Sequence, residues 1–585
     1  MEHIKTNFAN DIDRACPLKD YPRPQLEREE WLCLNGEWDF AIKAKGEPAP
    51  TEYREKILVP YAPETALSGV EKHPTAKDEM WYRRTFTIPS KWKGKRIILH
   101  LGAVDYKAVV YVNGSIAVEH EGGYCPFEAD ITDFLIAGEN TLIVNAYDPT
   151  DKGLQPRGKQ TDKSHGFWYT ATSGIWQTVW LEPVNKNHIK SVKLLPDIDS
   201  GELSVKADIF GKGTIKVTVI DGEDEITSAE FDSDGKLSIP NAKLWSPENP
   251  FLYSLRIEMI SAKRVVDTVK SYFGMRKFSI EKDYNGLPRL CLNNKPYFQR
   301  GLLDQGYHPD GGMTAPTDEA MIYDIATMKS LGFNMLRKHI KREPDRWYYH
   351  CDRLGMLVWQ DMISGSDYVS AVWCGICPNL NITGLDDGPK NYWKFKRTDS
   401  SAREQFKKEL WELIDGLYNS TSICCWVPFN ESWGQFDAKE IGTAVKNADP
   451  SRFVDHASGW HDQGGPDFVS IHKYILPVTL PKLDGERPFV LSEYGGYSMT
   501  IDNHVWDKLK SFGYMMFKSK QSLTNAFVKL HEKQIIPLID KGLSATVYTQ
   551  VSDVEFEVNG LLTYDRKLVK LDEDAVKKVI QKLHY

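Results

Sequence analysis

Two glutamates each follow a long apolar run in the second half of the sequence. Asn430 and Glu431 end the run "CCWVPFNESW" (residues 424–433), and Glu493 ends "PFVLSEYGG" (488–496), where two glycines let the backbone turn close beneath a ligand. An acid at such a place is either a solvated strand end or a catalytic group. Two carboxylates raised on different strands fit glycoside hydrolysis, in which one protonates the leaving oxygen and the other attacks the anomeric carbon or activates water. The pair, more than either residue alone, favours catalysis.

The region that contains both glutamates alternates apolar runs with stretches of helical period. Helical segments such as residues 318–332 and 401–419 separate several of these runs. Their number and the length of the region, 278–585, match a (β/α)₈ barrel, whose active sites lie at the carboxyl ends of the strands. Nearly every run ends there in polar residues. The runs cover residues 298–306, 334–340, 356–362, 423–432, 453–460, 468–474, 489–496 and 544–553.

The first half of the sequence consists of short strand-like runs. In residues 1–184, Val, Ile, Tyr and Trp alternate with polar residues and are punctuated by Gly, Asn and Asp, which is typical of a β-sandwich. Residues 185–277 continue this pattern over a length that suits a second, smaller sandwich. The predicted architecture is therefore sandwich, sandwich, barrel.

The composition restricts the partners of the protein. Of 585 residues, 81 are acidic and 73 are basic, and no basic block is present, which argues against nucleic-acid binding. The amino terminus contains no apolar run of the kind found in secretory signals, and no stretch approaches transmembrane length. We therefore expect a cytoplasmic protein that has no membrane partner.

The cysteines indicate reduced thiols and not a disulfide framework, because the nine are odd in number and scattered. Cys374 and Cys377 have CxxC spacing, but no second pair with zinc spacing follows. Buried or loop thiols are a better interpretation of this pair than a metal or redox site. The sequence offers no cluster of metal ligands.

Over essentially its whole length, the chain resembles glycoside hydrolase family 2, which contains β-galactosidases, β-glucuronidases and β-mannosidases. The segments "LNGEWDF", "YRRTFTIP", "GYCPFEADIT" and "GIWQTVWLEPV" resemble its jelly-roll sugar-binding sandwich. "LWSPENPFLY" and "FGMRKFSI" resemble its immunoglobulin-like domain and the exit into the barrel. "FNESWG" is similar to the acid/base motif of the family, and "LSEYGG" is similar to its nucleophile motif. This ordered set of motifs is highly specific.

The resemblance implies roles for individual residues. Glu431 matches the general acid/base and Glu493 the nucleophile, so a retaining double displacement is expected, with the carboxyl groups about 5–5.5 Å apart. Asn430 would hydrogen-bond the sugar 2-hydroxyl, and Tyr474 resembles a tyrosine that holds the nucleophile ionised. Tyr548 stands where relatives often carry a tryptophan under the sugar ring. Trp433 could line the leaving-group side or serve packing.

No cofactor is implied by this mechanism. Mg²⁺, Na⁺ or Ca²⁺ occurs in the family, but no ligand cluster can be named here. The expected partner is a glycoside or oligosaccharide substrate, and a homo-oligomer is compatible with the sequence.

The end of the second strand departs from the family pattern. Many relatives carry Arg-x-Ser-His-Tyr-Pro there, whereas this chain has "LRKHIKREP", in which Arg337 matches, His339 takes the Ser position and Ile340 the His position. On a strand of period two, Arg337, His339 and Lys341 share one face. If that face is inward, these three side chains line the sugar pocket.

Two interpretations of these three side chains stay open. They could balance Asp304, Asp361 and the catalytic glutamates, or one of them could hold a sugar carboxylate, which would make the substrate a β-hexuronide.

The substrate sugar also stays open. The Asn-x-Lys pair of glucuronidases is absent, because Leu561 stands at the Lys position of "EVNGLLTYDRK". A galacturonide, a glucuronide or a neutral β-galactoside is therefore a candidate substrate. Asp304 and Gln305 are candidate hydrogen-bond partners for the ring hydroxyls. A non-catalytic carbohydrate-binding protein is the more distant alternative.

Overall fold

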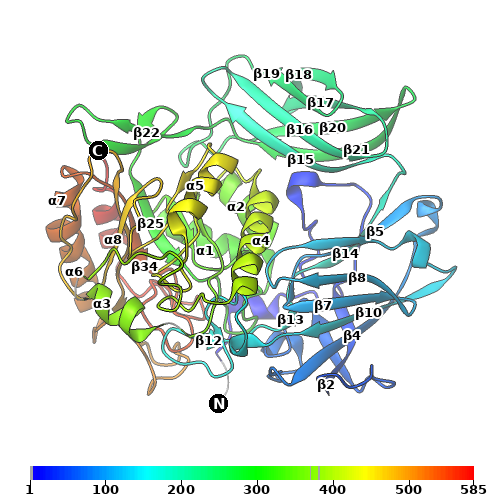
Figure 1. Cartoon of the computed structure of the whole chain (residues 1–585), viewed down its shortest axis with the longest axis horizontal. Helices are drawn as coiled ribbons and strands as arrows, with labels where there is room; N and C mark the ends of the chain where they lie inside the picture. The colour runs from blue at the N-terminus through cyan, green and yellow to red at the C-terminus, as the bar shows by residue number, and fades with distance from the viewer. Residues whose placement is uncertain (1–3, 369, 380–381) are drawn as a thin grey trace.

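Two β-sandwiches and a barrel follow one another along the chain in a computed structural model of the protein (Figure 1). The structure describes residues 4–368, 370–379 and 382–585. The predicted order of two sandwiches and a (β/α)₈ barrel is confirmed. In the view of Figure 1 the barrel lies beside the first sandwich, and the second sandwich lies above both.

The first sandwich packs a six-stranded sheet on a four-stranded sheet. Alternation along the strands creates its core, as where Leu142, Val144 and Ala146 are buried and the residues between them are only partly so. In sheet order, the larger sheet contains β3 (Glu55–Val59), β2 (Gly36–Ala44), β4 (Asp78–Thr87), β10 (Glu139–Tyr147), β7 (Lys107–Val112) and β8 (Ser115–Glu121). The smaller sheet contains β1 (Leu32–Cys33), β14 (Val179–Val184), β5 (Arg96–Leu101) and β9 (Phe127–Asp130).

The second sandwich is smaller and has its own apolar core. Its three-stranded sheet contains β15 (His188–Asp197), β16 (Glu202–Phe210) and β19 (Asp234–Ser238). Its four-stranded sheet contains β18 (Asp224–Phe231), β17 (Thr214–Asp221), β20 (Tyr253–Ser261) and β21 (Arg264–Phe273).

The barrel is a curled sheet of eight parallel strands with helices on its outer face. In sheet order its strands are β29 (Phe453–Val454), β28 (Ile423–Val427), β27 (Leu357–Asp361), β26 (Met335–Lys338), β25 (Gln299–Asp304), β34 (Leu543–Thr549), β31 (Phe489–Gly495) and β30 (Val469–Lys473). The main helices are α1 (Asp318–Ser330), α2 (Asp345–Leu354), α4 (Ser400–Leu417), α5 (Ala438–Ala448), α6 (Lys520–Leu530) and α8 (Glu573–Ile580). No helix in these described parts of the chain is long and apolar enough to cross a membrane.

Strand alternation decides which side chains reach the barrel interior. Leu303, Met335 and Trp359 belong to the apolar cluster inside the barrel, whereas Leu302 and Leu336 belong to the cluster between strands and helices. On β26, Arg337 therefore points inward like Met335, two residues before it.

A loop of the first sandwich lies over the rim of the barrel. Pro156 forms a β-bridge with Gly365, and the backbone N–H groups of Arg157 and Gly158 both donate to the Ser364 carbonyl, at 3.0 and 2.9 Å. The loop leads into β11 (Gln160–Thr161) and β12 (Tyr169–Thr170), which also lies at the barrel (Figure 1). The site at the carboxyl ends of the barrel strands is thus built from two domains.

Candidate active site

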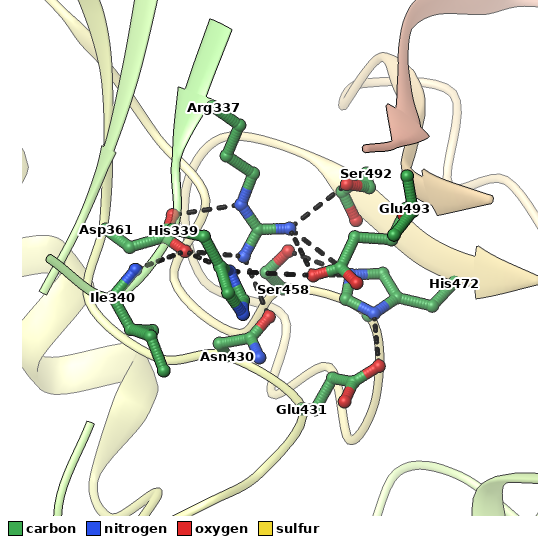
Figure 2. A network of polar contacts seen from close by, with 12 residues as sticks. Arg337, His339, Ile340, Asp361, Asn430, Glu431, Ser458, His472, Ser492 and Glu493 are labelled. Atoms are coloured by element: carbon green, nitrogen blue, oxygen red, sulfur yellow. Dashed lines mark hydrogen bonds and ion pairs between the residues drawn. The ribbon is translucent and has the colours of Figure 1, made fainter. Parts of the chain in front are cut away.

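Glu431 and Glu493 lie close together at the carboxyl ends of two barrel strands, with His472 beside both (Figure 2). Glu493 lies within β31, and Glu431 follows β28. One carboxylate oxygen of each glutamate and a ring nitrogen of His472 all lie within 4.8 Å of one another. Oxygens this close fit the spacing of about 5–5.5 Å in retaining glycosidases better than the spacing of about 6.5–9.5 Å that an inverting pair needs for its water.

Glu431 sits on a strained piece of backbone. Its φ is 48° and that of Ser432 is 63°, both in the left-handed region that such residues rarely adopt. The Glu431 N–H donates to the Ser458 carbonyl at 3.0 Å, which fixes the turn. Strain of this kind concentrates where a side chain must be aimed at a ligand.

The surroundings of Glu493 keep its carboxylate ionised. Arg337 Nη1 donates to Glu493 Oε1 at 3.1 Å, and the Tyr474 hydroxyl donates to Oε2. Burial by itself raises the pKa of Glu493, but the charges of His472 and Arg337 and the bond from Tyr474 outweigh burial and lower that pKa below its ordinary value. An ionised, buried carboxylate is what a nucleophile requires.

Arg337 lies at the centre of the network. Its Nε and Nη2 donate to the two oxygens of Asp361, at 2.9 and 3.1 Å, and Nη2 also donates to Asn430 Oδ1 at 2.8 Å. Its Nη1 donates to the Ser492 carbonyl at 3.0 Å as well as to Glu493. Because a guanidinium has five N–H groups, all of them are engaged. Arg337 orients Asn430 and Glu493 and has no N–H left to hold a sugar carboxylate.

His472 is a site residue that the sequence interpretation missed. It lies on β30, its Nδ1 is 2.8 Å from Glu431 Oε1, and its Nε2 is 3.2 Å from Ser458 Oγ and 3.8 Å from Glu493 Oε1. The imidazole therefore lies between the two carboxylates. The available indication was its place in "FVSIHKY", two residues before Tyr474 on the same apolar run.

The predicted face of three cations does not form as expected. His339 Nδ1 is 3.0 Å from Asp361 Oδ2, so His339 joins the Arg337 network. Burial lowers the pKa of His339 well below its ordinary value, and the positive charge of Lys159 acts in the same direction, so the ring is neutral. Ile340 then adopts φ 39°, which interrupts the period-two alternation.

Lys341 consequently points away from the two glutamates. Its ammonium donates to Glu343 Oε1 and the Met313 carbonyl, each at 2.8 Å, and to the Gly306 carbonyl. Burial lowers the pKa of Lys341 to about 8. Asp304 belongs to the same cluster, because Lys338 donates both to Asp304 Oδ2, at 2.7 Å, and to Glu343 Oε1, at 2.8 Å. The structure therefore brings neither Lys341 nor Asp304 to the catalytic pair.

Two further predicted residues, Gln305 and Tyr548, occupy different positions relative to the site. Gln305, which directly follows β25, is buried and donates to Oε1 of Gln550, which directly follows β34, at 2.7 Å. Tyr548 instead points outward, where its ring contacts those of Tyr494 and Phe527 with centroids 5.4 and 4.9 Å apart. The structure does not place Tyr548 under a sugar ring at the pair.

The first sandwich supplies aromatic and cationic groups that the sequence interpretation also missed. Trp433, two residues after Glu431, packs edge-on against Trp168 with ring centroids 5.0 Å apart, and the Arg157 guanidinium lies over both rings at 5.4–5.7 Å. Lys159 lies over the Tyr169 ring at 5.4 Å, with its ammonium 3.9 Å from Glu557 Oε2. The segment "QPRGKQ" (residues 155–160) contains no pattern that indicates contact with another domain. Its residues therefore could not be assigned to the site from the sequence.

Glu431, His472 and Glu493 also have the composition of a small metal site. Their contacting atoms are already engaged with one another, with Arg337 and with Tyr474, which fits a catalytic pair better than a cation cage.

The CxxC cysteines are not part of the pair. Cys374 is buried and close to the Ser432 carbonyl, with Sγ at 3.6 Å from that oxygen, and burial raises the pKa of its thiol to about 12. Such a thiol is inert at neutral pH.

Three family models match the chain in succession. "Glycosyl hydrolases family 2, sugar binding domain" matches residues 32–183, "Glycosyl hydrolases family 2" matches 187–276, and "Glycosyl hydrolases family 2, TIM barrel domain" matches 287–585.

Curated relatives carry two different names. A β-galactosidase of Thermoanaerobacter pseudethanolicus is 28% identical over 415 residues, which are 67% of this chain and 54% of that protein. A β-glucuronidase of Streptococcus agalactiae is 26% identical over 472 residues, which are 77% of this chain and 70% of that protein. The chain spans about half the length of the first relatives that it matches.

Solved structures share the fold over nearly the whole chain. The β-D-glucuronidase of Dictyoglomus thermophilum superposes with a TM-score of 0.74 at 19% identity, covering 97% of this chain and 99% of that one. A β-glucuronidase of Ruminococcus gnavus gives 0.74 at 18% identity, covering 95% and 98%. At these identities the likeness concerns the fold alone.

Proposed function

From the premise that the chain belongs to glycoside hydrolase family 2, we propose that it is a retaining exo-β-glycosidase acting on terminal non-reducing β-glycosides. One observation carries this proposal: two glutamates on separate barrel strands whose oxygens lie within 4.8 Å, one of them buried and held ionised.

In the first step the glycosidic bond breaks while the enzyme–sugar bond forms. The Glu493 carboxylate attacks the anomeric carbon, and Glu431 donates its proton to the departing oxygen. Arg337 and Tyr474 hold Glu493 in place for this attack. Asn430, oriented by Arg337, is placed to hydrogen-bond the sugar 2-hydroxyl.

In the second step water releases the sugar. Glu431, now a carboxylate, takes a proton from water, and the resulting hydroxide attacks the anomeric carbon and displaces Glu493. Each step occurs on the opposite face of the sugar from the last, so the configuration is retained. No step requires a metal ion or a cofactor.

For the sugar, we propose a β-hexuronide of galacturonide or glucuronide type. Support comes from Lys159, a lysine that the first sandwich brings to the rim of the barrel, because an ammonium in a largely buried setting binds carboxylates well. A neutral β-galactoside is the second candidate, since a curated relative at 28% identity is named β-galactosidase.

A panel of 4-nitrophenyl β-glycosides tests this function. We expect release of nitrophenolate from the β-D-galacturonide or β-D-glucuronide, with kcat/KM above that for the β-D-galactoside and β-D-glucoside. Turnover confined to the neutral sugars would replace the hexuronide assignment by the galactosidase one. No turnover of any aryl β-glycoside would support a non-catalytic sugar-binding protein.

A further inference from the structure

Lys159, like Arg157, is a cation that the first sandwich brings to this site. Among the residues that the structure describes, it has no hydrogen-bond acceptor, and the nearest acid oxygen, Glu557 Oε2, is 3.9 Å away. That oxygen already accepts from the Tyr169 hydroxyl, and Glu557 Oε1 accepts from Asn559. The Lys159 side chain is 14% exposed, so it is largely buried but still in contact with solvent.

An ammonium has three N–H donors, and none of the described residues accepts from this one at hydrogen-bond distance. The faces of Tyr169 and Phe167, with ring centroids 5.4 and 5.8 Å from Nζ, are its close contacts besides Glu557. An anion that entered the pocket would supply the missing acceptors.

The position of Lys159 places such an anion on the sugar side of the site. Its charge acts on His339, which follows β26, and its nearest acid is Glu557, which follows β34. In the sheet, β25 lies between β26 and β34, whereas the acid Glu431 follows β28, further round the barrel. Since the leaving group lies at Glu431, this strand order favours the sugar side of the site for an anion bound by Lys159.

The loop that carries Lys159 is fixed against the barrel. Gly158 has φ +63°, and a Cβ there would lie 2.9 Å from the Ile340 carbonyl oxygen, so the backbone passes directly over the end of β26. The bonds from Arg157 and Gly158 to Ser364 anchor the same turn. Lys159 is therefore presented by a rigid element, as a specificity residue must be.

We propose that Lys159, contributed by the first sandwich, binds the C6 carboxylate of the substrate and sets the preference for uronides over the corresponding neutral glycosides. This inference rests on the proposed hexuronidase function. It assigns carboxylate recognition to a residue outside the barrel, and Arg337, His339 and Lys341 then serve the glutamates or the barrel wall.

The test compares kcat/KM for a 4-nitrophenyl β-uronide with kcat/KM for its 6-hydroxy counterpart in Lys159 variants. Lys159→Met keeps the stem that packs on Tyr169 but removes the charge, and should lower the uronide-to-neutral ratio about ten- to a hundred-fold. Lys159→Arg keeps the charge and should restore most of the ratio. Lys163→Met, at an exposed lysine between β11 and β12, should leave the ratio unchanged.

The outcomes distinguish a failure of the role proposed for Lys159 from a failure of the proposed hexuronidase function. If the unmodified enzyme hydrolyses uronides and Lys159→Met leaves the ratio unchanged, or lowers both activities equally, the role of Lys159 is overturned while the function stands. If the unmodified enzyme hydrolyses only neutral glycosides, the hexuronide function fails and the inference fails with it. Melting temperatures of the variants identify any loss that comes from misfolding.

Discussion

At the scale of single residues, the two glutamates differ in what surrounds them. Glu493 is 3% exposed and receives donors from Arg337 and Tyr474, whereas the Glu431 side chain is 29% exposed and contacts His472. A buried, ionised carboxylate suits attack on carbon, and a more open one suits exchange of protons with a leaving group and with water. The local contacts therefore support the proposed division of roles.

Glu431→Ala should slow substrates according to their leaving group. Aryl glycosides that release nitrophenolate need little protonation, whereas alkyl glycosides should lose about 10²–10⁴-fold in kcat/KM, the usual contribution of general acid catalysis. Steady-state kinetics on a series of leaving groups measures this, with Glu440→Ala on the exposed face of α5 as control. Equal losses across the series would show that Glu431 is not the acid.

At the scale of elements, the sequence predicts strands better than it predicts where their ends point. The eight apolar runs correspond to the eight barrel strands because buried parallel strands need continuous apolar stretches. The positions of Glu431 and Glu493 followed directly from those runs. Period-two alternation places Arg337 correctly, because Arg337 lies within β26, but it does not hold for Lys341, because Ile340 leaves the strand conformation.

Other parts of the site could not be predicted because they depend on tertiary contacts. Tyr548 belongs to the outer face of β34, and nothing in its local sequence shows which way that strand is turned. Lys159 reaches the barrel only through a loop of another domain, more than a hundred residues from β25 in the sequence. His472 could have been predicted from the sequence, because it lies two residues before Tyr474 on the same strand-like run.

At the scale of the whole molecule, the first sandwich and the barrel share a buried, protonated acid. Glu409 on α4 is 2% exposed, and its Oε1 accepts from the hydroxyl of Tyr106 in the sandwich at 3.2 Å. Burial raises the pKa of Glu409 to about 8. The folded protein therefore binds this proton at neutral pH, where the unfolded chain has released it.

The free energy of unfolding depends on pH because the folded and unfolded states differ in the protonation of Glu409. Since the folded state holds the extra proton between the ordinary pKa of 4.5 and about 8, the free energy of unfolding should fall as pH rises through that window, by up to about 1.4 kcal/mol per unit. Glu409→Gln keeps the acceptor for Tyr106 and should raise the melting temperature at pH 8 but not at pH 4.5. Glu404→Gln, an exposed change on the same helix, should have no such effect. Parallel melting curves for Glu409→Gln and the unmodified protein across this range would contradict the account.

The most direct test of the central claim is the anomeric configuration of the azide adducts formed by two variants, read by ¹H NMR. With a nitrophenyl β-glycoside and azide, Glu493→Ala should give the α-glycosyl azide, because azide enters the space left by the nucleophile. Glu431→Ala should give the β-glycosyl azide, because azide replaces water in the second step of an otherwise intact double displacement. A β-azide from Glu493→Ala, or the same anomer from both variants, would contradict the assignment of Glu493 as nucleophile and Glu431 as acid/base.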